Sequence, residues 1–562
     1  MIDKIWLKHY PAGIPAEIDP DRFKNLADLF DDIVAKFADK PALHNLGCTM
    51  NYGELGRRSR DFAAFLQGLP GMTKGERVAV MSPNLLQYPV LLFGILRAGM
   101  TVVNVNPLYT PRELEHQLKD SGAKAIFILE NFASTLQQVI KNTPVTHVIT
   151  SQVGDLLPPP KRWLVNFVVK RVKKMVPDWR IDGATTFPAA IARGAKAPFK
   201  AVAVAPDEIA FLQYTGGTTG VAKGAMLTHR NMLANLEQVG VWVSRTFKEG
   251  TEIAIVPLPM YHIFCLTSSL AFMKWGSLLV LITNPRDMPA FIEELQKWKW
   301  SVMTGVNTLF NGLLNAPGFD KLDFSGVKVV VGGGAAVQRP VAEHWKQVTG
   351  GYITEAYGLT EASPGVCANL LDAAWNGTIG LPFSSTEVSI RDDRFNELPI
   401  WTGEGDLEIH TGEICVRGPQ VMKGYWKMPE ETAKVMQDGW LKTGDVGNMN
   451  ADGFVTITDR KKDMIVVSGF KVFPNEIESV VAMHQGVLEC GVVGVQDDKS
   501  GEAVKVVIVR KDLLLTKEAI VAHCRLQLTA YKVPRHVEFR DALPKSPIGK
   551  VLRRELRETR QS

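Results

Sequence analysis

Apolar runs and helical segments alternate through the first quarter of the chain. Residues 77–81, 101–105 and 125–129 form short, almost continuous apolar runs, and residues 85–97 are predicted to form a helix between two of them. Thr110, Pro111 and Glu113 supply an N-cap, a first-turn proline and a capping box for a helix that ends near Gly122. Continuous apolar strands are buried on both faces. The pattern predicts an α/β fold, with a large N-terminal domain of βα units and sheets that carry helices on both faces.

The pattern changes beyond Asn475. A predicted helix is followed by strands at 489–495 and 503–509, a helix at 517–528 and a strand at 536–539. A unit of about one hundred residues is domain-sized. We therefore predict two domains, an N-terminal domain at 1–458 and a small α+β C-terminal domain at 459–562.

Residues 156–180 interrupt the alternation with a proline run and a basic amphipathic stretch. No acidic residue occurs from Lys161 to Val176, and one face of a helical wheel gathers Leu164, Val165, Val168, Val172, Met175 and Val176. The cations Arg162, Lys170, Lys173 and Lys174 lie roughly opposite, and Trp163 and Phe167 fall toward the basic side. Two interpretations remain open. The helix lies on a membrane surface, which suits its composition, or it packs on its own protein with a solvated basic face.

Composition limits the partners and the cellular compartment that can be expected for this chain. The net charge is only +5, from 64 basic and 59 acidic residues, so no general attraction to nucleic acid is predicted. The six cysteines lack metal-site spacing, which is typical of free thiols in a reducing compartment. Lys274 interrupts the apolar stretch at 263–282, which is predicted to be core rather than a membrane span. The first residues lack an apolar stretch of signal-peptide length, so we expect a cytoplasmic protein.

A glycine- and threonine-rich loop is predicted to bind phosphate. After an apolar run at 209–212, three hydroxyls, four glycines and one cation follow: Thr215, Gly216, Gly217, Thr218, Thr219, Gly220, Lys223 and Gly224. Glycines allow successive amides to line one concavity, and hydroxyls and a lysine add donors suited to phosphate oxygens. Because Ala222 precedes Lys223, the loop is not a Walker A motif. It is predicted to join two strands.

Two further motifs indicate a nucleotide when this loop is present. Tyr357 offers a ring to stack on a base, and Glu361 offers a carboxylate that can hold Mg²⁺ while phosphates supply other ligands. Asp445 and Arg460, at the ends of two predicted short strands, could bracket ribose hydroxyls, although an ordinary surface ion pair is the alternative. Together with the loop, these residues suggest ATP.

Three other features have weaker patterns. His262 stands between a strand and an apolar helix, where a substrate carboxylate could end, although a lone histidine is more often structural. Gly333, Gly334 and Ala335 follow a strand and allow close approach by a ligand, with a tight turn as the alternative. Two prolines and a glycine at 543–550 predict an exposed loop that presents Lys550, and the alternative is a solvated basic tail.

In this order, the motifs resemble those of the adenylate-forming superfamily of acyl-CoA synthetases over nearly the whole chain. The resemblance rests on Tyr-Thr-Gly-Gly-Thr-Thr-Gly-Val-Ala-Lys-Gly at 214–224, Tyr-Gly-Leu-Thr-Glu at 357–361, Thr-Gly-Asp at 443–445 and Pro-Lys-Ser-Pro-Ile-Gly-Lys at 544–550. Residues 104–116 and 459–470 are similar to those of bacterial long-chain fatty-acid–CoA ligases. The resemblance implies activation of a long-chain fatty acid by ATP and Mg²⁺ to an acyl-adenylate, followed by transfer to coenzyme A, as the step that starts β-oxidation.

The resemblance also implies roles for individual residues. The β- and γ-phosphates would be held by the loop residues Thr215, Gly216, Gly217, Thr218, Thr219, Gly220 and Lys223. Glu361 would hold the Mg²⁺. Tyr357 and Gly358 would bind the adenine, and Asp445 and Arg460 would bind the ribose. Thr360, Lys550 and His262 are assigned as catalytic: Thr360 would contact the α-phosphate, Lys550 would bridge it to the carboxylate, and His262 would lie beside the acyl group. The acyl-chain contacts would come from the turn at 262–264, from residues 305–308 and from Gly333, Gly334 and Ala335.

A mobile C-terminal domain is part of the same expectation. It would swing about a hinge near Asp459 and Arg460, and would present Gly469 and Phe470 to coenzyme A. Some aryl-acid relatives carry a lysine six residues after the arginine, where this chain has Val466, so Val466 is assigned no role in thioester formation. A homodimer is a further expectation.

Three functions remain open at this point. The first is a long-chain acyl-CoA ligase. The second is a related adenylate-forming ligase for a medium-chain or aryl acid, or one that loads a carrier protein. The third is a fatty-acid-binding protein that keeps the fold but has no ATP chemistry.

Overall fold

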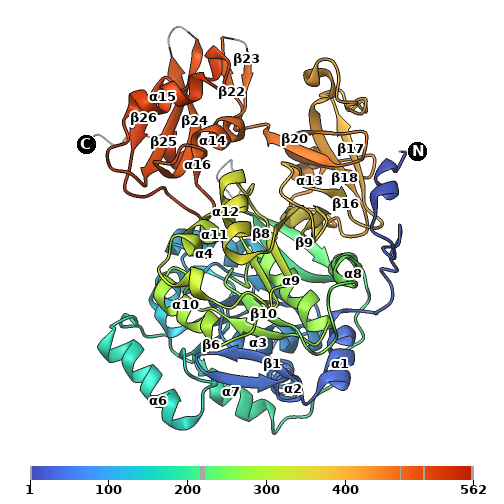
Figure 1. Ribbon diagram of the computed structural model, residues 1–562. Coiled ribbons are helices and arrows are strands. Elements are labelled where there is room, and N and C mark those ends of the chain that lie inside the picture. Colours follow the sequence, from blue (N-terminus) through green and yellow to red (C-terminus); the bar gives the residue numbers. More distant parts are fainter. Residues whose placement is uncertain (1–2, 216–221, 469, 498–499, 558–562) are drawn as a thin grey trace.

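The computed structural model describes residues 3–215, 222–468, 470–497 and 500–557. They form a large body, a lobe above it that contains residues 387–460, and a separate C-terminal part beside that lobe (Figure 1). The loop glycines and threonines at 216–220 and Gly469 lie outside the described residues.

One sheet of the body has seven strands in the order β7-β6-β5-β3-β4-β8-β9. They are β3 (Arg77–Met81), β4 (Thr101–Asn104), β5 (Ala125–Leu129), β6 (His147–Ser151), β7 (Thr185–Thr186), β8 (Ile209–Thr215) and β9 (Lys223–Thr228). Neighbours are parallel except for β8 and β9, which are antiparallel. The predicted strands at 77–81 and 125–129 and the two-strand setting of the phosphate loop are confirmed.

The second sheet of the body has nine strands in the order β16-β15-β14-β13-β12-β10-β11-β1-β2. They are β1 (Pro41–Asn45), β2 (Cys48–Asn51), β10 (Ile253–Val256), β11 (Leu278–Leu281), β12 (Val302–Gly305), β13 (Val329–Gly332), β14 (Ile353–Gly358), β15 (Gly365–Ala368) and β16 (Leu381–Pro382). Phe127 of the first sheet and Val280 of the second belong to one buried core cluster. The two sheets therefore pack as one body.

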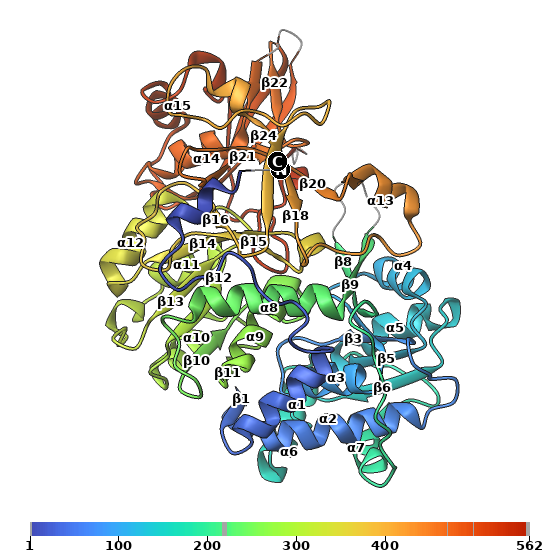
Figure 2. The ribbon, with the colours of Figure 1, turned by 90° about the vertical axis from the view of Figure 1, so that its right-hand side faces the viewer.

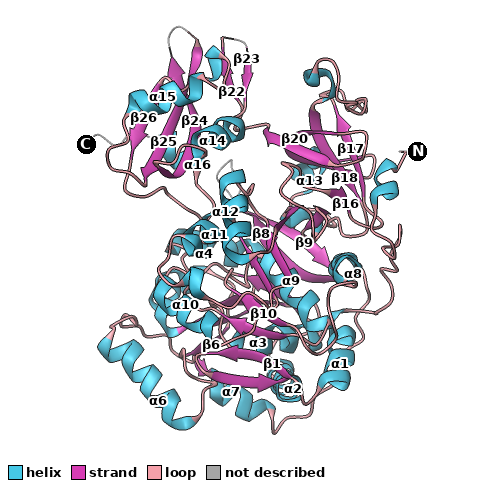
Figure 3. Cartoon of the chain, viewed as in Figure 1, coloured by secondary structure: helices cyan, strands magenta, loops and turns pink. Residues whose placement is uncertain are grey.

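Helices cover both sheets (Figures 2 and 3). In the body they are α1 (Leu26–Phe37), α2 (Tyr52–Gln67), α3 (Gln87–Arg97), α4 (Pro111–Ser121), α5 (Ala133–Val139), α6 (Pro159–Phe167), α7 (Phe187–Gly194), α8 (His229–Val243), α9 (Ile263–Lys274), α10 (Met288–Gln296), α11 (Asn307–Leu314) and α12 (Arg339–Thr349). Thr110 and Glu113 form the predicted capping box of α4, and Gly122 ends the helix at φ 66°. Glycine suits this left-handed conformation because it has no Cβ.

The lobe and the C-terminal part each contain a separate five-stranded sheet. The lobe has β17 (Glu387–Arg391), β18 (Gly412–Arg417), β19 (Met436–Gln437), β20 (Trp440–Met449), β21 (Val455–Arg460) and helix α13 (Pro429–Val435). The C-terminal part has β22 (Ile465–Val467), β23 (Phe470–Val472), β24 (Val487–Asp497), β25 (Gly501–Arg510), β26 (His536–Phe539), α14 (Pro474–Ala482), α15 (Lys517–Arg525) and α16 (Arg553–Arg557). The predicted α+β character of this part is confirmed.

Two local expectations change with the tertiary structure. The stretch at 263–282 is divided between α9 and β11, and among the described residues no helix is long and apolar enough to cross a membrane. The loop at 544–550, predicted to be exposed, is half-buried, and Thr308 Oγ1 donates a hydrogen bond to the carbonyl of Gly549 at 2.8 Å. Its prolines and glycine prevent regular structure, but they do not keep the loop in solvent, because α11 offers it a partner.

Candidate active site

A cavity of about 670 Å³ lies where the two body sheets, the lobe and the C-terminal loop meet. Strands β8, β9, β14, β20 and β21, helices α8 and α9 and the loop that carries Lys550 all contribute to its wall. One region is polar and charged, and another is lined by apolar side chains. A wider cleft of about 2110 Å³ adjoins it and shares Tyr357 and Lys550 with it.

Lys223 marks the phosphate side of the cavity. Thr215 and Lys223 face each other in register at the ends of β8 and β9, so they hold the two ends of the glycine-rich loop together. The Lys223 ammonium pairs with Glu431 and lies 5.2 Å from the centre of the Tyr425 ring. Tyr425 and Glu431 were not predicted from the sequence, because neither belongs to a recognisable motif.

Glu361 lies on the same side and could hold a cation. It follows β14 in a short 3₁₀ turn with Thr360, and both line the cavity. The Tyr425 hydroxyl donates to Glu361 Oε1 at 2.7 Å, which orients the carboxylate. A single carboxylate with room for phosphate oxygens fits Mg²⁺, which takes most of its ligands from substrate phosphates and water in such sites. Among the described residues, no cluster of three or more His, Cys, Asp or Glu side chains could hold a metal.

Tyr357, Asp445 and Arg460 form a connected group on the nucleoside side. The Tyr357 hydroxyl donates to Asp445 Oδ2 at 2.6 Å, and Arg460 Nε lies 3.0 Å from Asp445 Oδ1. Asp445 and Arg460 are directly opposite each other on β20 and β21, so backbone pairing brings them together. Burial raises the pKa of Tyr357 well above its ordinary value, and the Asp445 carboxylate adds to the effect. The hydroxyl is therefore a permanent donor.

Close backbone packing surrounds these side chains. A Cβ on Gly358 would lie 2.3 Å from the carbonyl oxygen of Pro364, so only glycine fits there. Gly333 and Gly334 line the cavity, and Gly334 has φ +74°. Ala335 lies in the wider cleft. Gln338 is held by Asn307, whose Oδ1 accepts from the Gln338 amide at 2.9 Å, so the loop is tied to α11.

Lys550 lines the cavity, although it belongs to the C-terminal part of the chain. The Ser546 hydroxyl oxygen accepts from the Lys550 amide at 3.1 Å, and the Lys550 carbonyl accepts from the Ser546 amide at 2.7 Å. Burial lowers the pKa of the Lys550 ammonium to about 8, and the Arg460 cation adds to the effect. At neutral pH the side chain remains mostly charged.

His262 lines the cavity at the start of α9. Its Nδ1 accepts a hydrogen bond from the Phe264 amide at 3.3 Å, so one ring nitrogen caps the helix. Burial lowers its pKa to about 4, and the Lys550 cation adds to the effect. His262 is thus neutral at physiological pH, and it combines a structural contact with a position in the site.

The turn at 262–264, expected to contact the acyl chain, lines the cavity, but most of the cavity's apolar lining was not predicted from the sequence. The apolar region is lined by side chains from α8, α9, β13 and the segment after β15, among them Val239, Trp242, Val243, Phe272, Val331 and Leu371. Apolar positions on helices look the same in a sequence whether they face core or cavity. Of the expected acyl-site residues at 305–308, Val306 and Thr308 instead lie beside Gly549 of the C-terminal loop.

Phe470 lies away from this cavity. It is 55 % exposed on β23, and its ring stacks on Tyr531 with centroids 4.7 Å apart. Among the described candidates, the structure brings together Thr215, Lys223, His262, Gly333, Gly334, Tyr357, Gly358, Thr360, Glu361, Asp445, Arg460 and Lys550.

Known protein families match both parts of the chain. The model of the AMP-binding enzyme family matches residues 30–426, and that of the AMP-binding enzyme C-terminal domain matches residues 476–550. The chain is 55 % identical to a long-chain-fatty-acid–CoA ligase of Escherichia coli O6:H1, over 99 % of this chain and 98 % of that protein. It is 49 % identical to a ligase of the same name from Haemophilus influenzae, with the same coverage.

Among solved structures, the anthranilate CoA ligase AuaEII in complex with anthranoyl-AMP has a TM-score of 0.84 and is 24 % identical, covering 96 % of this chain and 98 % of that chain. This likeness shows the shared fold. The match of family models to both parts of the chain, with relatives of high identity along its whole length, establishes the family. The chain belongs to the AMP-binding enzymes.

Proposed function

We propose that this chain is an ATP-dependent ligase that activates long-chain fatty acids to acyl-CoA and so supplies β-oxidation. The observation that carries the proposal is one cavity in which a phosphate-binding side, a ribose-binding side and an apolar region meet beside Lys550. The long-chain-fatty-acid–CoA ligases that match the whole chain support the substrate class.

In the first half-reaction, the fatty acid carboxylate attacks the α-phosphorus of ATP and pyrophosphate leaves. Both reactants are anions, so the step needs positive charge and a fixed orientation. Lys223 and the preceding loop hold the β- and γ-phosphates, Thr360 binds the α-phosphate, and the Lys550 ammonium bridges that phosphate and the carboxylate. When Mg²⁺ is bound at Glu361, it neutralises charge on the phosphates.

The remaining residues orient the two substrates. Tyr357 stacks on the adenine, and the Asp445 carboxylate accepts from ribose hydroxyls while Arg460 and the Tyr357 hydroxyl hold it in place. The acyl chain occupies the apolar region beside α8 and α9. The neutral His262 lies where the nucleotide-binding part of the cavity meets its apolar region, and the substrate carboxylate ends there.

In the second half-reaction, the thiol of coenzyme A attacks the acyl carbonyl and AMP leaves. Lys550 occupies the cavity in the structure described here, whereas Phe470 is outside it. The C-terminal domain, taken as residues 459–562, therefore withdraws Lys550 and brings the Gly469–Phe470 turn to the site. The wide cleft gives coenzyme A a route to the cavity.

ATP–pyrophosphate exchange with a series of acids tests the proposal. We expect exchange with palmitate and oleate, less with octanoate, and formation of the acyl-CoA when coenzyme A is added. Exchange with ferulate or benzoate alone would indicate the aryl-acid alternative. Absence of exchange with every acid would overturn the enzymatic function and leave a fatty-acid-binding protein.

Helix α6 supports a peripheral membrane partner on the cytoplasmic face of the inner membrane. Polar side chains of α6 face the body: Arg162 lies 3.4 Å from Asp155, and Asn166 accepts from the Gly154 amide at 2.8 Å. A π-helical turn (Val168–Val172) continues α6, and its Lys170 lies 3.4 Å from Glu130. Trp163 and Phe167, which are 71 % and 59 % exposed, point outward. In Figure 1 the helix lies at the edge of the body, far from the C-terminal part.

Exposed aromatic and aliphatic side chains near the exposed Lys173 and Lys174 suit the surface of an anionic bilayer. Leu164, Val172 and Met175 of the same segment are exposed as well. The segment from Lys161 to Val176 therefore holds the enzyme where its fatty acid substrate accumulates.

Association into a homodimer stays a prediction, which light scattering over a range of protein concentrations checks.

A further inference from the structure

A short linker joins the lobe to the C-terminal part. Strand β21 pairs with β20 as far as Arg460, and the Lys461 amide still donates to the Gly444 carbonyl at 3.0 Å. Strand β22, which begins at Ile465, belongs to the C-terminal sheet. A rotation of the C-terminal part therefore has its pivot within residues 461–464, a few residues beyond the boundary at 459 and the hinge near Asp459 and Arg460 that were expected from the sequence. Asp459 and Arg460 stay with the lobe.

Asp459 makes contacts across this pivot. Its side chain is 0 % exposed, and its Oδ1 accepts from the Arg460 amide at 2.7 Å and from Arg553 Nη1 at 2.9 Å. Its Oδ2 accepts from the Asn475 amide at the start of α14, at 2.8 Å. One buried carboxylate thus holds both a helix and an arginine of the C-terminal part.

Arg553 is anchored on the other side of the pivot. Its Nε and Nη2 donate to the two carboxylate oxygens of Glu478 at 3.1 Å and 2.9 Å, and Nη2 also donates to Asn475 Oδ1. Asp463 lies 3.5 Å away. Glu478 in turn accepts from the Val492 amide of β24, which ties the arginine to the C-terminal sheet.

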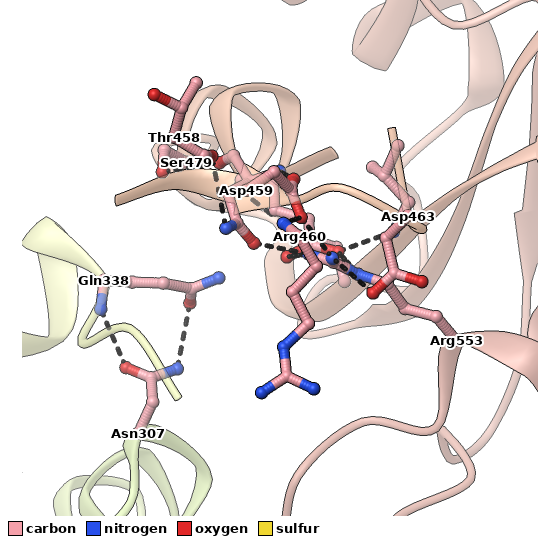
Figure 4. A network of polar contacts seen from close by, with 12 residues as sticks. Asn307, Gln338, Thr458, Asp459, Arg460, Asp463, Ser479 and Arg553 are labelled. Carbon is pink, nitrogen blue, oxygen red and sulfur yellow. Dashed lines mark hydrogen bonds and ion pairs between the residues drawn. The ribbon is translucent and has the colours of Figure 1, made fainter. Parts of the chain in front are cut away.

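Figure 4 shows this geometry: Arg553 reaches from the C-terminal side to Asp459, while the side chain of Arg460 leaves the network in another direction. Arg553 begins α16, three residues after Lys550. Whatever holds Arg553 against Asp459 also limits where Lys550 can lie.

We propose that Arg553 is a positioning residue, a latch that holds Lys550 in the cavity for adenylation by closing its ion pair with Asp459. The proposal rests on the two half-reactions and the domain rotation proposed above. Rotation about residues 461–464 separates Asp459 from Arg553 and from the Asn475 amide, and it leaves the buried carboxylate without these partners. Breaking one side of a buried ion pair is strongly unfavourable. The latch therefore favours the adenylating arrangement and has to open before thioester formation.

The test uses Arg553→Gln and Asp459→Asn in the full-length enzyme. Each variant breaks the same ion pair from a different side of the pivot. We expect ATP–pyrophosphate exchange with palmitate to fall by about 30-fold or more in both. Formation of acyl-CoA from supplied palmitoyl-adenylate and coenzyme A should stay within about threefold of wild type, because that step does not need Lys550 in the cavity.

Arg554→Gln is the matched control, because it removes the same charge from the next position of α16, where the side chain is exposed. The double variant Arg553→Gln/Asp459→Asn should lose no more exchange than either single variant, since the two residues act as one unit. Arg553→Lys keeps the charge but cannot span Asp459 and Glu478 together, and it should show an intermediate loss.

If Arg553 only stabilises the C-terminal part through Glu478, Asp459→Asn should leave exchange unchanged, and Arg553→Gln should lower both half-reactions equally. Either result overturns the proposal. Trypsin cleavage after Lys461 or Lys462, read by mass spectrometry, should be faster in both single variants than in wild type. This readout needs no activity, so it tests the latch even if wild-type protein shows no exchange. An unchanged cleavage rate contradicts it.

Discussion

Lys550 brings a positive charge into a cavity that already contains Arg460. Burial and that neighbour lower the pKa of Lys550 to about 8, so the charge is retained at neutral pH but held against an electrostatic cost. The two anionic substrates offset that cost when they bind. The charged form of Lys550 is therefore most stable when the carboxylate and the α-phosphate are both present. The residue thus has one clear task, in the first half-reaction.

Replacing Lys550 by alanine should separate the two half-reactions. We expect ATP–pyrophosphate exchange to fall by about 10² to 10³-fold, because one preorganised cation is lost from the transition state. Acyl-CoA formation from supplied acyl-adenylate should remain near wild type. Lys545→Ala, in the same loop but paired with Glu489, is the control. An equal loss of both activities would contradict the assigned role.

The pH dependence of adenylation follows from the same lysine. A group whose pKa is lowered loses its proton at lower pH, so the Lys550 charge should disappear as pH rises through about 8. The rate of acyl-adenylate formation should therefore decline above pH 8. Lys550→Arg stays charged throughout this range, and whatever activity it retains should show no such decline. The measurement is adenylation from pH 6.5 to 9.5 at substrate concentrations well below saturation, because the rate then reports the protonation state of the free enzyme.

Tyr357 supplies both a ring and a hydroxyl. Tyr357→Phe keeps the ring but removes the donor to Asp445. Loss of one hydrogen bond to a carboxylate should raise the KM for ATP by about 3- to 10-fold, with a smaller change in kcat. The KM for the fatty acid is the internal control. A large fall in kcat at unchanged KM would contradict a nucleoside-positioning role.

At the scale of single elements, the sequence predicts a structure correctly where interactions between neighbouring residues determine it. The capping box of α4 was readable because its capping residues lie within one turn of the helix they start. Helix α6 differs. Its wheel showed an apolar and a basic side, but only packing decided that Arg162 and Lys170 turn toward the body while Trp163 and Phe167 face outward.

The membrane proposal is tested on that outward surface. Trp163→Ser/Phe167→Ser, and separately Lys173→Glu/Lys174→Glu, should each weaken sedimentation with vesicles of phosphatidylcholine and phosphatidylglycerol by about tenfold or more. Leu513→Ser/Leu514→Ser removes equally exposed apolar side chains from the C-terminal part and should have no effect. Binding unchanged in both α6 variants would sink the proposal.

At the scale of the whole molecule, the cavity exists only because four parts meet. The phosphate side comes from the first sheet, the nucleoside side from β14 and the lobe, and Lys550 from the C-terminal part. The apolar region lies among α8, α9 and the second sheet. Its depth depends on side chains whose sequence neighbours are ordinary core residues.

Filling that region should change the preferred acid. Val239 lies on α8 and lines the apolar region of the cavity. Val239→Phe adds volume there, so we expect palmitate to be rejected relative to octanoate by about tenfold in kcat/KM, with the KM for ATP unchanged. Val239→Ala is the paired variant and should not shift the preference toward shorter acids. A uniform loss for all acids would indicate disruption of α8 instead.

The sequence by itself indicated the strands at 77–81, 101–105 and 125–129, the capping box of α4 and the motif residues that line the cavity, because these depend on short-range patterns and on groups whose chemistry needs particular residue types. Only the tertiary structure decided that Tyr425 links Lys223 to Glu361, that α8 and α9 line an apolar cavity, and that Arg553 meets Asp459 across a linker. Such contacts join residues far apart in the chain. The sequence around each of these residues does not reveal its partner, because the same local sequence could place the side chain against any neighbour of suitable charge and size.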